Sequence, residues 1–177
     1  MVIGEKGPIG RIELSKKVGL GEGATRTIIK HLTAGGFVES AKEGCLLTQR
    51  GMSLYKSLHS KLSEIHSVNA RQFALDRASA GVLIRNAGTG VRRGIEQRDA
   101  AIVAGASGAC TLVYRNDKFV MPMGEGEEWS LGSQDLLYKD LKELFMPNED
   151  DVITLVSAAN AGLAEHCAMA AALTLLG

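Results

Sequence analysis

Apolar side chains recur at helical spacing in the first sixty residues, and glycines interrupt the pattern. Ile12, Leu14 and Val18 form the first stripe, which Gly19 stops. Lys42-Glu43-Gly44 is typical of a tight turn between two short strands. In chain order we expect a helix over 11–18, a helix over 22–34, a strand over 37–41, a turn at 42–44, a strand over 45–48 and a helix over 51–62.

The pattern changes after residue 63. Residues 64–71 show no sustained periodicity and are interpreted as a linker, which places a first domain at 1–63 and a second at 72–177. Strands and helices alternate in the second domain, which is typical of a small layered α/β or α+β fold. The expected elements are strands over 80–84, 109–114, 118–121 and 152–156, helices over 91–104, 134–145 and 161–176, and an acidic loop over 124–132.

The charge is distributed unevenly between these two parts. The chain has 177 residues and a formal net charge of zero, yet residues 1–63 hold ten Lys and Arg against five Asp and Glu. Residues 64–177 hold ten against fifteen. Because phosphate attraction dominates the affinity of proteins for nucleic acids, only the first part is suited to a polyanionic partner. Hydrophobic residues make up 45% and charged residues 23%, which indicates a folded globular protein.

Several classes of protein are excluded by what the sequence lacks. Cys45, Cys110 and Cys167 are widely spaced and contain no CxxC pair, so neither a disulfide framework nor a conventional zinc site is expected. The apolar run 161–176 is interrupted by Glu165, and no basic-then-apolar leader begins the chain. We therefore expect a cytoplasmic protein that neither spans a membrane nor is secreted.

The order of helix, glycine turn, helix, hairpin and helix resembles the winged helix-turn-helix DNA-binding domain. The segments that carry this resemblance are 12–20, 25–32, 36–39 and 47–51. It implies that the helix over 22–32 lies in the major groove of double-stranded DNA and that 42–44 contacts the backbone or the minor groove. The chain departs from the family in one respect, because only residues 1–6 precede the Gly7-Pro8 break where a full first helix is usual.

The candidate DNA-binding residues lie on the polar face of the helix over 22–34 and around the hairpin. Thr25, Ile29 and Leu32 form the apolar face of that helix, which leaves its cations on the other side, where they can reach phosphates. The full set is Glu22, Gly23, Arg26, Thr27, Lys30, Lys42 and Arg50. Two other uses of such a domain stay open, because winged helices also serve as protein-interaction modules and as appendages of enzymes.

The second half also resembles a known domain. It is similar to the C-terminal domain of an archaeal family of uncharacterised winged-helix proteins, which are described only as transcription regulators. The segments 94–102, 105–109 and 120–122 carry this resemblance. Together the two resemblances cover nearly the whole chain, and they imply the two-domain layout without assigning a reaction.

A glycine-rich connection between a predicted strand and helix is the candidate site for a small anionic metabolite. Glycines permit close approach of the backbone, and backbone N–H groups at the start of a helix attract anions. Arg98 is expected within the apolar stripe of the helix over 91–104, either as half of an ion pair or as a ligand clamp. The candidate residues are Arg85, Asn86, Gly88, Thr89, Gly90, Arg92, Arg93 and Arg98. A flexible loop with solvated arginines is the competing interpretation.

No catalytic residue, metal site or cofactor is predicted. His166 and Cys167 are adjacent, so on a helix they point about 100° apart and form no aligned base and nucleophile. Glu125, Glu127 and Glu128 could bind a hard cation, but a glycine-bearing acidic run is more often a solvated loop.

These observations favour a transcription regulator whose second domain senses an anionic metabolite, dimerises, or does both. Ala161, Ala164, Ala168 and Ala172 recur at helical spacing, so the last helix could pack closely against another element or against a second subunit, and a homodimer is expected. The main alternative is an enzyme or enzyme subunit with its active site near Arg85 and Arg98. A protein-interaction adaptor is the third interpretation.

Overall fold

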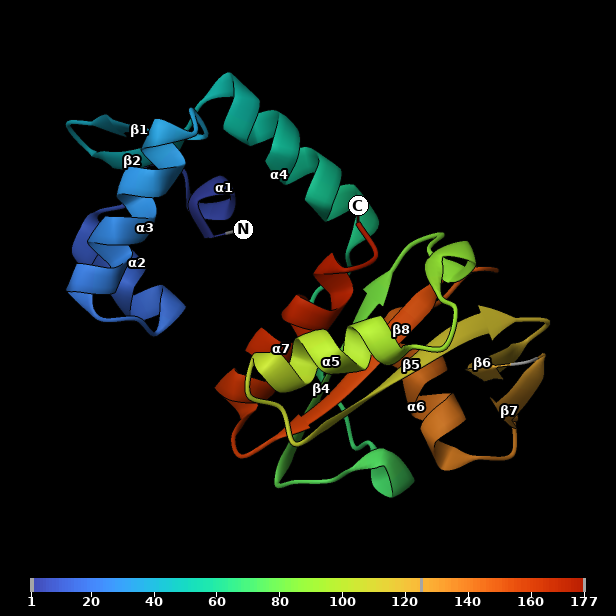
Figure 1. Ribbon diagram of the computed structural model, residues 1–177. Helices are drawn as coiled ribbons and strands as arrows, with labels where there is room; N and C mark the ends of the chain where they lie inside the picture. The colour runs from blue at the N-terminus through green and yellow to red at the C-terminus, as the bar shows by residue number, and fades with distance from the viewer. Residues whose placement is uncertain (1, 125, 177) are drawn as a thin grey trace. The chain divides into compact units, whose positions relative to one another are not determined.

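The computed structural model describes residues 2–124 and 126–176 of the chain. The chain divides into two compact units, Met1–Ser60 and Lys61–Gly177. Figure 1 draws the first in blue to teal and the second in green to red. The fold is of the mixed α+β kind, with helices dominating the first unit and one large sheet in the second.

The first unit consists of four helices and one hairpin. Its elements are α1 (Val2–Lys6), α2 (Arg11–Val18), α3 (Glu22–Ala34), β1 (Val38–Ala41), β2 (Gly44–Leu47) and α4 (Gln49–Lys61). The two helices predicted over 11–18 and 22–34 are confirmed with the same bounds. Helix α4 begins two residues earlier than predicted, because the Thr48 hydroxyl accepts the N–H of Gly51 at 3.0 Å and caps the first turn.

A small core holds the hairpin against the helices of this unit. The strands pair in antiparallel register, and the Ile9 and Cys45 backbones exchange two hydrogen bonds of 3.0 and 2.9 Å. Gly44 sits so close to this junction that a Cβ there would lie 2.5 Å from the Ile9 carbonyl carbon. The core side chains are Ile3, Ile9, Leu14, Val38 and Cys45. The hairpin is therefore fixed to the segment that leads into α2.

The second unit is built on a six-stranded antiparallel sheet. Its strands are β3 (His66–Ser67), β4 (Ala78–Ile84), β5 (Gly108–Arg115), β6 (Lys118–Gly124), β7 (Glu127–Leu131) and β8 (Val152–Ala158). Their spatial order is β3-β4-β8-β5-β6-β7, so the last strand in the chain is inserted between β4 and β5. All seven residues of β8 are buried, as expected of a central strand covered on both faces.

Helices cover both faces of this sheet (Figure 1). On one face lie α5 (Ile95–Val103) and α7 (Ala161–Leu173), and on the other lies α6 (Leu136–Phe145). Because side chains alternate along a strand, Val152 and Val156 of β8 join the core under α7, while Ile153 and Leu155 join the core under α6. Two short 3₁₀ turns, η1 (Arg71–Phe73) and η2 (Gly88–Gly90), complete the unit.

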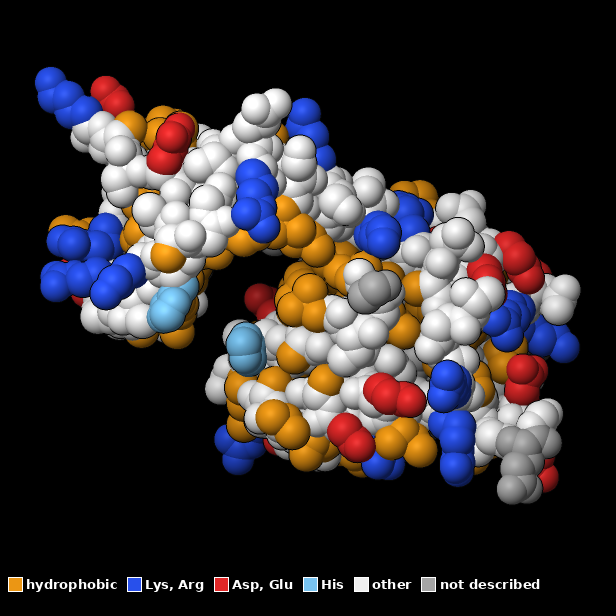
Figure 2. Space-filling view, turned by 45° about the horizontal axis from the view of Figure 1, so that its top comes forward, with side chains coloured by type: hydrophobic (Ala, Val, Ile, Leu, Met, Phe, Trp, Pro, Cys, Tyr) orange, Lys and Arg blue, Asp and Glu red, His pale blue; other side chains and the backbone are white. Residues whose placement is uncertain are grey.

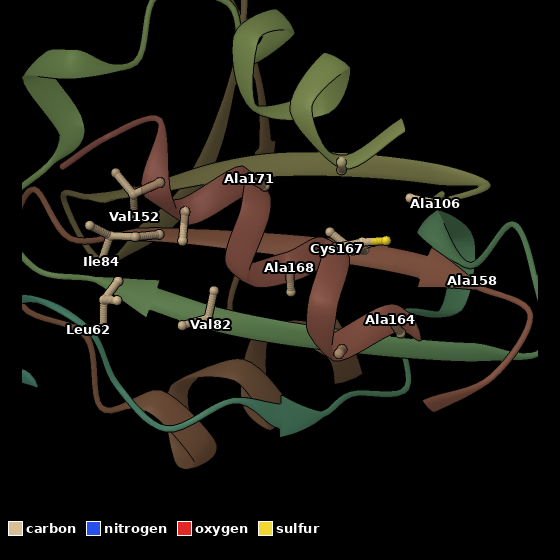
Figure 3. Close-up of a cluster of buried hydrophobic side chains, with 14 of the residues drawn as sticks. Leu62, Val82, Ile84, Ala106, Val152, Ala158, Ala164, Cys167, Ala168 and Ala171 are labelled. Atoms are coloured by element: carbon tan, nitrogen blue, oxygen red, sulfur yellow. The ribbon is translucent and has the colours of Figure 1, made fainter. Parts of the chain in front are cut away.

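The alanines of α7 are used inside the unit. Ala164, Ala168 and Ala172 are fully buried and belong to the core that α7 forms with β4 and β8. Figure 3 shows α7 lying on the sheet, with Ala164, Ala168 and Ala171 spread along the helix and Val82 on a strand behind it. Small side chains allow this close approach of helix and sheet. Of the two partners predicted for these alanines, another element of the same chain is confirmed, so they give no support to a second subunit.

Two segments expected to be irregular form strands. Residues 127–131 were predicted to lie in an acidic loop, but they form strand β7. Leu131 is buried, and the Trp129 ring packs edge-on against the Phe73 ring with 5.4 Å between the ring centres, so both side chains hold this segment on the sheet. The strand predicted to stop at Pro122 continues as β6 to Gly124. The pairing with β5 ends at Val120, so the missing N–H of proline costs no hydrogen bond there.

The segment interpreted as a linker also contributes to the sheet. Residues 66–67 form β3, in which His66 lies opposite Gly81 of β4, and the N–H of Val68 donates to the Ser79 carbonyl at 3.0 Å. Val68 is buried in the core under α6. One apolar residue and a two-residue strand give too little periodicity to be recognised in the sequence.

Gly51→Ala should destabilise the first unit. A Cβ at this position would lie 2.0 Å from the Phe37 carbonyl oxygen, so the hairpin or α4 would have to shift. We expect the free energy of unfolding to fall by about 1–3 kcal/mol. Gly23→Ala is the control, because Gly23 of α3 has open space around it, and this change should raise stability by about 0.5–1 kcal/mol. Urea denaturation followed by far-ultraviolet circular dichroism compares them, and equal stability would contradict the close contact.

Candidate nucleic-acid interface

A short turn joins α2 to α3 and sets the direction of α3. Gly19 adopts a left-handed backbone with φ 65, and its N–H donates to the Ser15 carbonyl. The Ser15 hydroxyl in turn donates to the Leu20 carbonyl at 2.6 Å, and the Leu20 N–H donates to the Ser15 carbonyl at 3.1 Å. Bonds in both directions close the turn, so α3 leaves it at a fixed angle.

Helix α3 has one buried side and one exposed side. Thr25 is buried and its hydroxyl donates to the Gly21 carbonyl at 3.1 Å, while Ile29 and Leu32 pack against the core. Within residues 2–124 and 126–176, no carboxylate lies within 4.0 Å of the charged groups of Arg26 and Lys30. The predicted residues of α3 are all exposed, namely Glu22, Gly23, Arg26, Thr27 and Lys30.

A hollow of about 230 Å³ lies between α3 and the hairpin. Arg11 and Arg26 both line it, beside Ser40 and Ala41 of β1. Two arginines that line one hollow suit a phosphate group, because a guanidinium can donate two parallel hydrogen bonds to it. Sequence reasoning missed Arg11. It is the first residue of α2, and only the pairing of Ile9 with the hairpin brings it to this place.

Two further predicted residues stand at the hairpin and at the start of α4. Lys42 is exposed at the turn between β1 and β2. Arg50 is exposed and its Cζ lies 4.6 Å from the centre of the Phe37 ring, a cation–π contact that orients the guanidinium. Figure 2 shows a group of Lys and Arg side chains at the left end of the first unit and further ones across the same face. The structure thus places all seven predicted DNA-binding residues in one unit and at its surface.

The loop predicted to bind an anionic metabolite already uses several of its N–H groups for bonds within the protein. The N–H of Asn86 donates to the Asp151 carboxylate at 2.8 Å, and that of Gly88 donates to the Asp150 carbonyl at 2.9 Å. Two more N–H groups close the turn η2 (Gly88–Gly90). These four N–H groups are therefore bonded within the protein, two of them to the acidic residues that precede β8.

The arginines of the same predicted site have separate surroundings. Arg85 faces the buried Asp151 carboxylate at 3.7 Å. Arg98 is exposed and bonds to its neighbour Asp99 at 2.9 Å, so its expected place in an apolar stripe is wrong. Helix α5 begins at residue 95 rather than 91, and its buried face carries Gln97. The remaining members of the set, Thr89, Arg92 and Arg93, are exposed.

A cluster of four titratable side chains, which sequence reasoning missed, lies at the tip of the β5–β6 hairpin. Asp117 accepts hydrogen bonds from the Tyr114 hydroxyl at 2.6 Å, from the Tyr138 hydroxyl at 3.0 Å and from the Lys142 ammonium. Together the Lys142 ammonium and the two hydroxyls lower the pKa of Asp117 to about 2. Two of its four members could have been paired from the sequence, because Tyr138 and Lys142 are four residues apart in a predicted helix and therefore lie on the same face.

The charge states in this cluster fit a structural role. Desolvation and the Asp117 carboxylate raise the pKa of Tyr114 to about 12, and the bond to Asp117 raises the pKa of Lys142. At neutral pH the lysine is therefore charged and Tyr114 is protonated, so neither is poised as a base or a nucleophile. The cluster fastens the hairpin tip to α6.

The cysteines and acidic residues offer no alternative chemistry in the parts that the structure describes. Burial raises the pKa of Cys110 to about 12 and also raises that of Cys167. No three His, Cys, Asp or Glu side chains among the described residues are placed to hold a metal ion. Of the acidic run, Glu127 and Glu128 belong to β7, and Glu125 lies outside the described residues. No described helix has the length and apolar character needed to cross a membrane.

Comparisons with known proteins divide the chain into two matched regions. Residues 75–175 match the family described as Domain of unknown function (DUF4443). The chain belongs to this family. Residues 2–53 match the family described as PH0730-like, N-terminal domain. The structure is similar to that of the hypothetical protein PH0730 from Pyrococcus horikoshii OT3, with a TM-score of 0.63 and 25% identity over 98% of this chain and 88% of that chain. A search of the curated proteins found no match.

The candidate sites fall in different matched regions. The predicted DNA-binding residues, from Glu22 to Arg50, lie within the PH0730-like segment. The loop at 85–93 and the Asp117 cluster lie within the DUF4443 segment. Neither family description names a ligand or a reaction, so a proposal about function must come from the geometry of the chain itself.

Acid titration should reveal the contribution of Asp117 to the second unit. Folding lowers its pKa from 3.8 to about 2, so the ionised carboxylate stabilises the fold above pH 3.8, and this stabilisation is lost as the pH falls through 2. Asp117→Asn should remove it, and Asn tolerates the left-handed backbone at this turn. Urea denaturation followed by the fluorescence of Trp129, the single tryptophan, measures the effect. The destabilisation by Asp117→Asn should shrink with decreasing pH, and a loss that does not depend on pH would contradict the assignment.

Proposed function

We propose that this protein is a cytoplasmic DNA-binding transcription regulator whose first unit is a winged helix-turn-helix domain. The exposed side of α3 carries the proposal, because Arg26 and Lys30 have no carboxylate partner there among the residues that the structure describes. Cations that the protein does not neutralise are available to phosphates. Lys42 at the hairpin turn extends the same kind of surface.

The order of the elements supports this assignment. In winged helix-turn-helix domains the second helix of the pair enters the major groove, and the hairpin touches the backbone or the minor groove. Helix α3 is the second helix here, and its 13 residues give a length of about 20 Å. That is longer than the width of the major groove, which is about 12 Å. The fixed turn at Gly19 would hold α3 at one angle as it enters.

The proposal divides the contacts into two kinds. Thr27 and Glu22, near the start of α3, would face base edges, where a carboxylate can accept from the cytosine amino group. Residues 1–60 hold nine Lys and Arg against five Asp and Glu, so phosphate attraction is present but moderate. The side chains assigned to phosphates are Arg11, Arg26, Lys30, Lys42 and Arg50.

We propose that the protein binds DNA as a homodimer. About five phosphate contacts per chain give an affinity that falls steeply with salt, and a single recognition helix reads only a few base pairs. A two-fold dimer reads two half-sites about one helical turn apart and adds their contacts. Dimer formation would therefore raise the affinity of this moderately charged domain for its DNA site.

The second unit has a different role in this proposal. It holds eleven Lys and Arg against fifteen Asp and Glu, so it is not expected to touch DNA. The anionic metabolite predicted at 85–93 is not part of this proposal, because the N–H groups of Asn86 and Gly88 already donate to Asp151 and Asp150. An enzyme with its site near Arg85 and Arg98 gains no support either, since each of these residues has its own carboxylate partner.

Replacing Arg26 and Lys30 together by alanine should weaken duplex binding and flatten its dependence on salt. Each lost phosphate contact lowers the slope of log K against log salt by about 0.9, so we expect a decrease of about 2 per chain. Fluorescence anisotropy with labelled duplex DNA at several salt concentrations measures the slope.

The matched control removes one arginine and one lysine from the second unit. Arg98→Ala with Lys139→Ala changes exposed residues of α5 and α6 and should leave the slope as in the unmodified chain. A slope unaffected by the change at Arg26 and Lys30 would remove these residues from the interface. The proposed function fails if the unmodified chain binds no duplex at low salt.

A further inference from the structure

The hollow between α3 and the hairpin of the first unit has an unbalanced positive charge. Its described lining contains two arginines and no acidic side chain, namely Arg11, Arg26, Ile29, Ser40, Ala41, Gly44 and Cys45. Among the residues that the structure describes, no carboxylate forms an ion pair with Arg11 or Arg26. Both positive charges are therefore available to an anion from outside the protein.

The two arginines come from different helices, and contacts within the unit hold both helices in place. Arg11 begins α2, two residues after Ile9, whose backbone exchanges two hydrogen bonds with Cys45 of β2. Arg26 follows Thr25, which is buried in the unit. An anion can therefore contact both arginines without a rearrangement of the backbone, and this lowers the cost of binding.

We propose that this hollow binds one phosphate group, held by Arg11 and Arg26 together, and that a free phosphate-bearing small molecule there competes with DNA. A guanidinium group donates two parallel hydrogen bonds to an oxyanion, a geometry that a chloride ion cannot match. The Ser40 hydroxyl in the lining is a further donor. The competition rests on the proposed function, whereas the binding of free phosphate is tested without DNA.

The size of the hollow limits what it can hold. Pockets that enclose a whole small molecule usually have about 300–1,000 Å³, and this hollow has about 230 Å³. A water molecule occupies about 30 Å³ of the liquid, so the space suffices for one phosphate group with little beside it. Recognition then falls on the phosphate group itself, and inorganic phosphate and different phosphate monoesters should bind alike.

A phosphate group in this hollow would act directly on DNA binding. Arg26 belongs to the exposed side of α3 that carries the proposed function, so a bound phosphate occupies a contact that is otherwise offered to the DNA backbone. Each such contact contributes to the affinity for DNA and to its dependence on salt. A small phosphate-bearing molecule would thus weaken DNA binding through the first unit alone.

Nuclear magnetic resonance of the full isotope-labelled chain without DNA tests the site. The chain is titrated with sodium phosphate while sodium chloride keeps the ionic strength constant. We expect saturable shifts of the Nε–H signals of Arg11 and Arg26, and Arg11→Ala or Arg26→Ala should weaken phosphate binding by about tenfold. Lys16→Ala is the matched control, because it removes an exposed charge of α2 outside the hollow and should bind phosphate as the unmodified chain does. Shifts that do not saturate, or equal binding by the alanine variants at Arg11 and Arg26, overturn the proposal.

Fluorescence anisotropy with a labelled duplex tests the competition. At constant ionic strength, saturating phosphate in place of chloride should raise the dissociation constant of the unmodified chain and of Lys16→Ala by at least about threefold, and that of Arg11→Ala much less. Duplex binding by the unmodified chain that phosphate leaves unchanged would overturn the competition. A chain that binds phosphate saturably but no duplex would contradict the proposed function and still support the phosphate site, so the two failures are distinguishable.

Discussion

The proposed function depends on one small core, in which Ile9 and Leu14 pack against Val38 and Cys45. The two hydrogen bonds between the Ile9 and Cys45 backbones fasten the hairpin to the start of α2, and the glycine turn after α2 then fixes α3. Without this contact, Arg11, Arg26 and Lys42 would belong to separate segments. The contact brings these three residues onto one compact unit. Thr25 of α3 is buried in that unit, so the cations on the other side of α3 face solvent.

The same core leaves one side of the unit unfinished. Helix α1 has five residues and contacts Tyr55 of α4, and apolar side chains of α2, α3 and α4 line a groove of about 370 Å³. The basic side of α3 and the apolar groove are therefore two consequences of one arrangement, since α3 contributes to both from opposite sides.

Much of the first unit could be predicted from the sequence, because its helices end at glycines and its apolar positions are periodic. Arg11 could not be assigned, since its proximity to Arg26 depends on pairing between residues 9 and 45. In the second unit the loop at 85–93 was misjudged for a similar reason. The N–H groups of Asn86 and Gly88 donate to Asp151 and Asp150, which follow these two residues by more than sixty positions. Strand β7 could not be recognised, because its glutamates give it the composition of a loop. The Asp117 cluster could not be recognised either, because the hairpin and α6 that form it are far apart in the sequence.

The central claim is that α3 and the hairpin of the first unit meet double-stranded DNA. The most direct measurement is a residue-by-residue nuclear magnetic resonance titration of the full isotope-labelled chain with a duplex at low salt. We expect the largest amide shifts in residues 22–30 and 42–44, with the sheet of the second unit unaffected. Shifts confined to the second unit, or no shifts with any duplex, would contradict the claim.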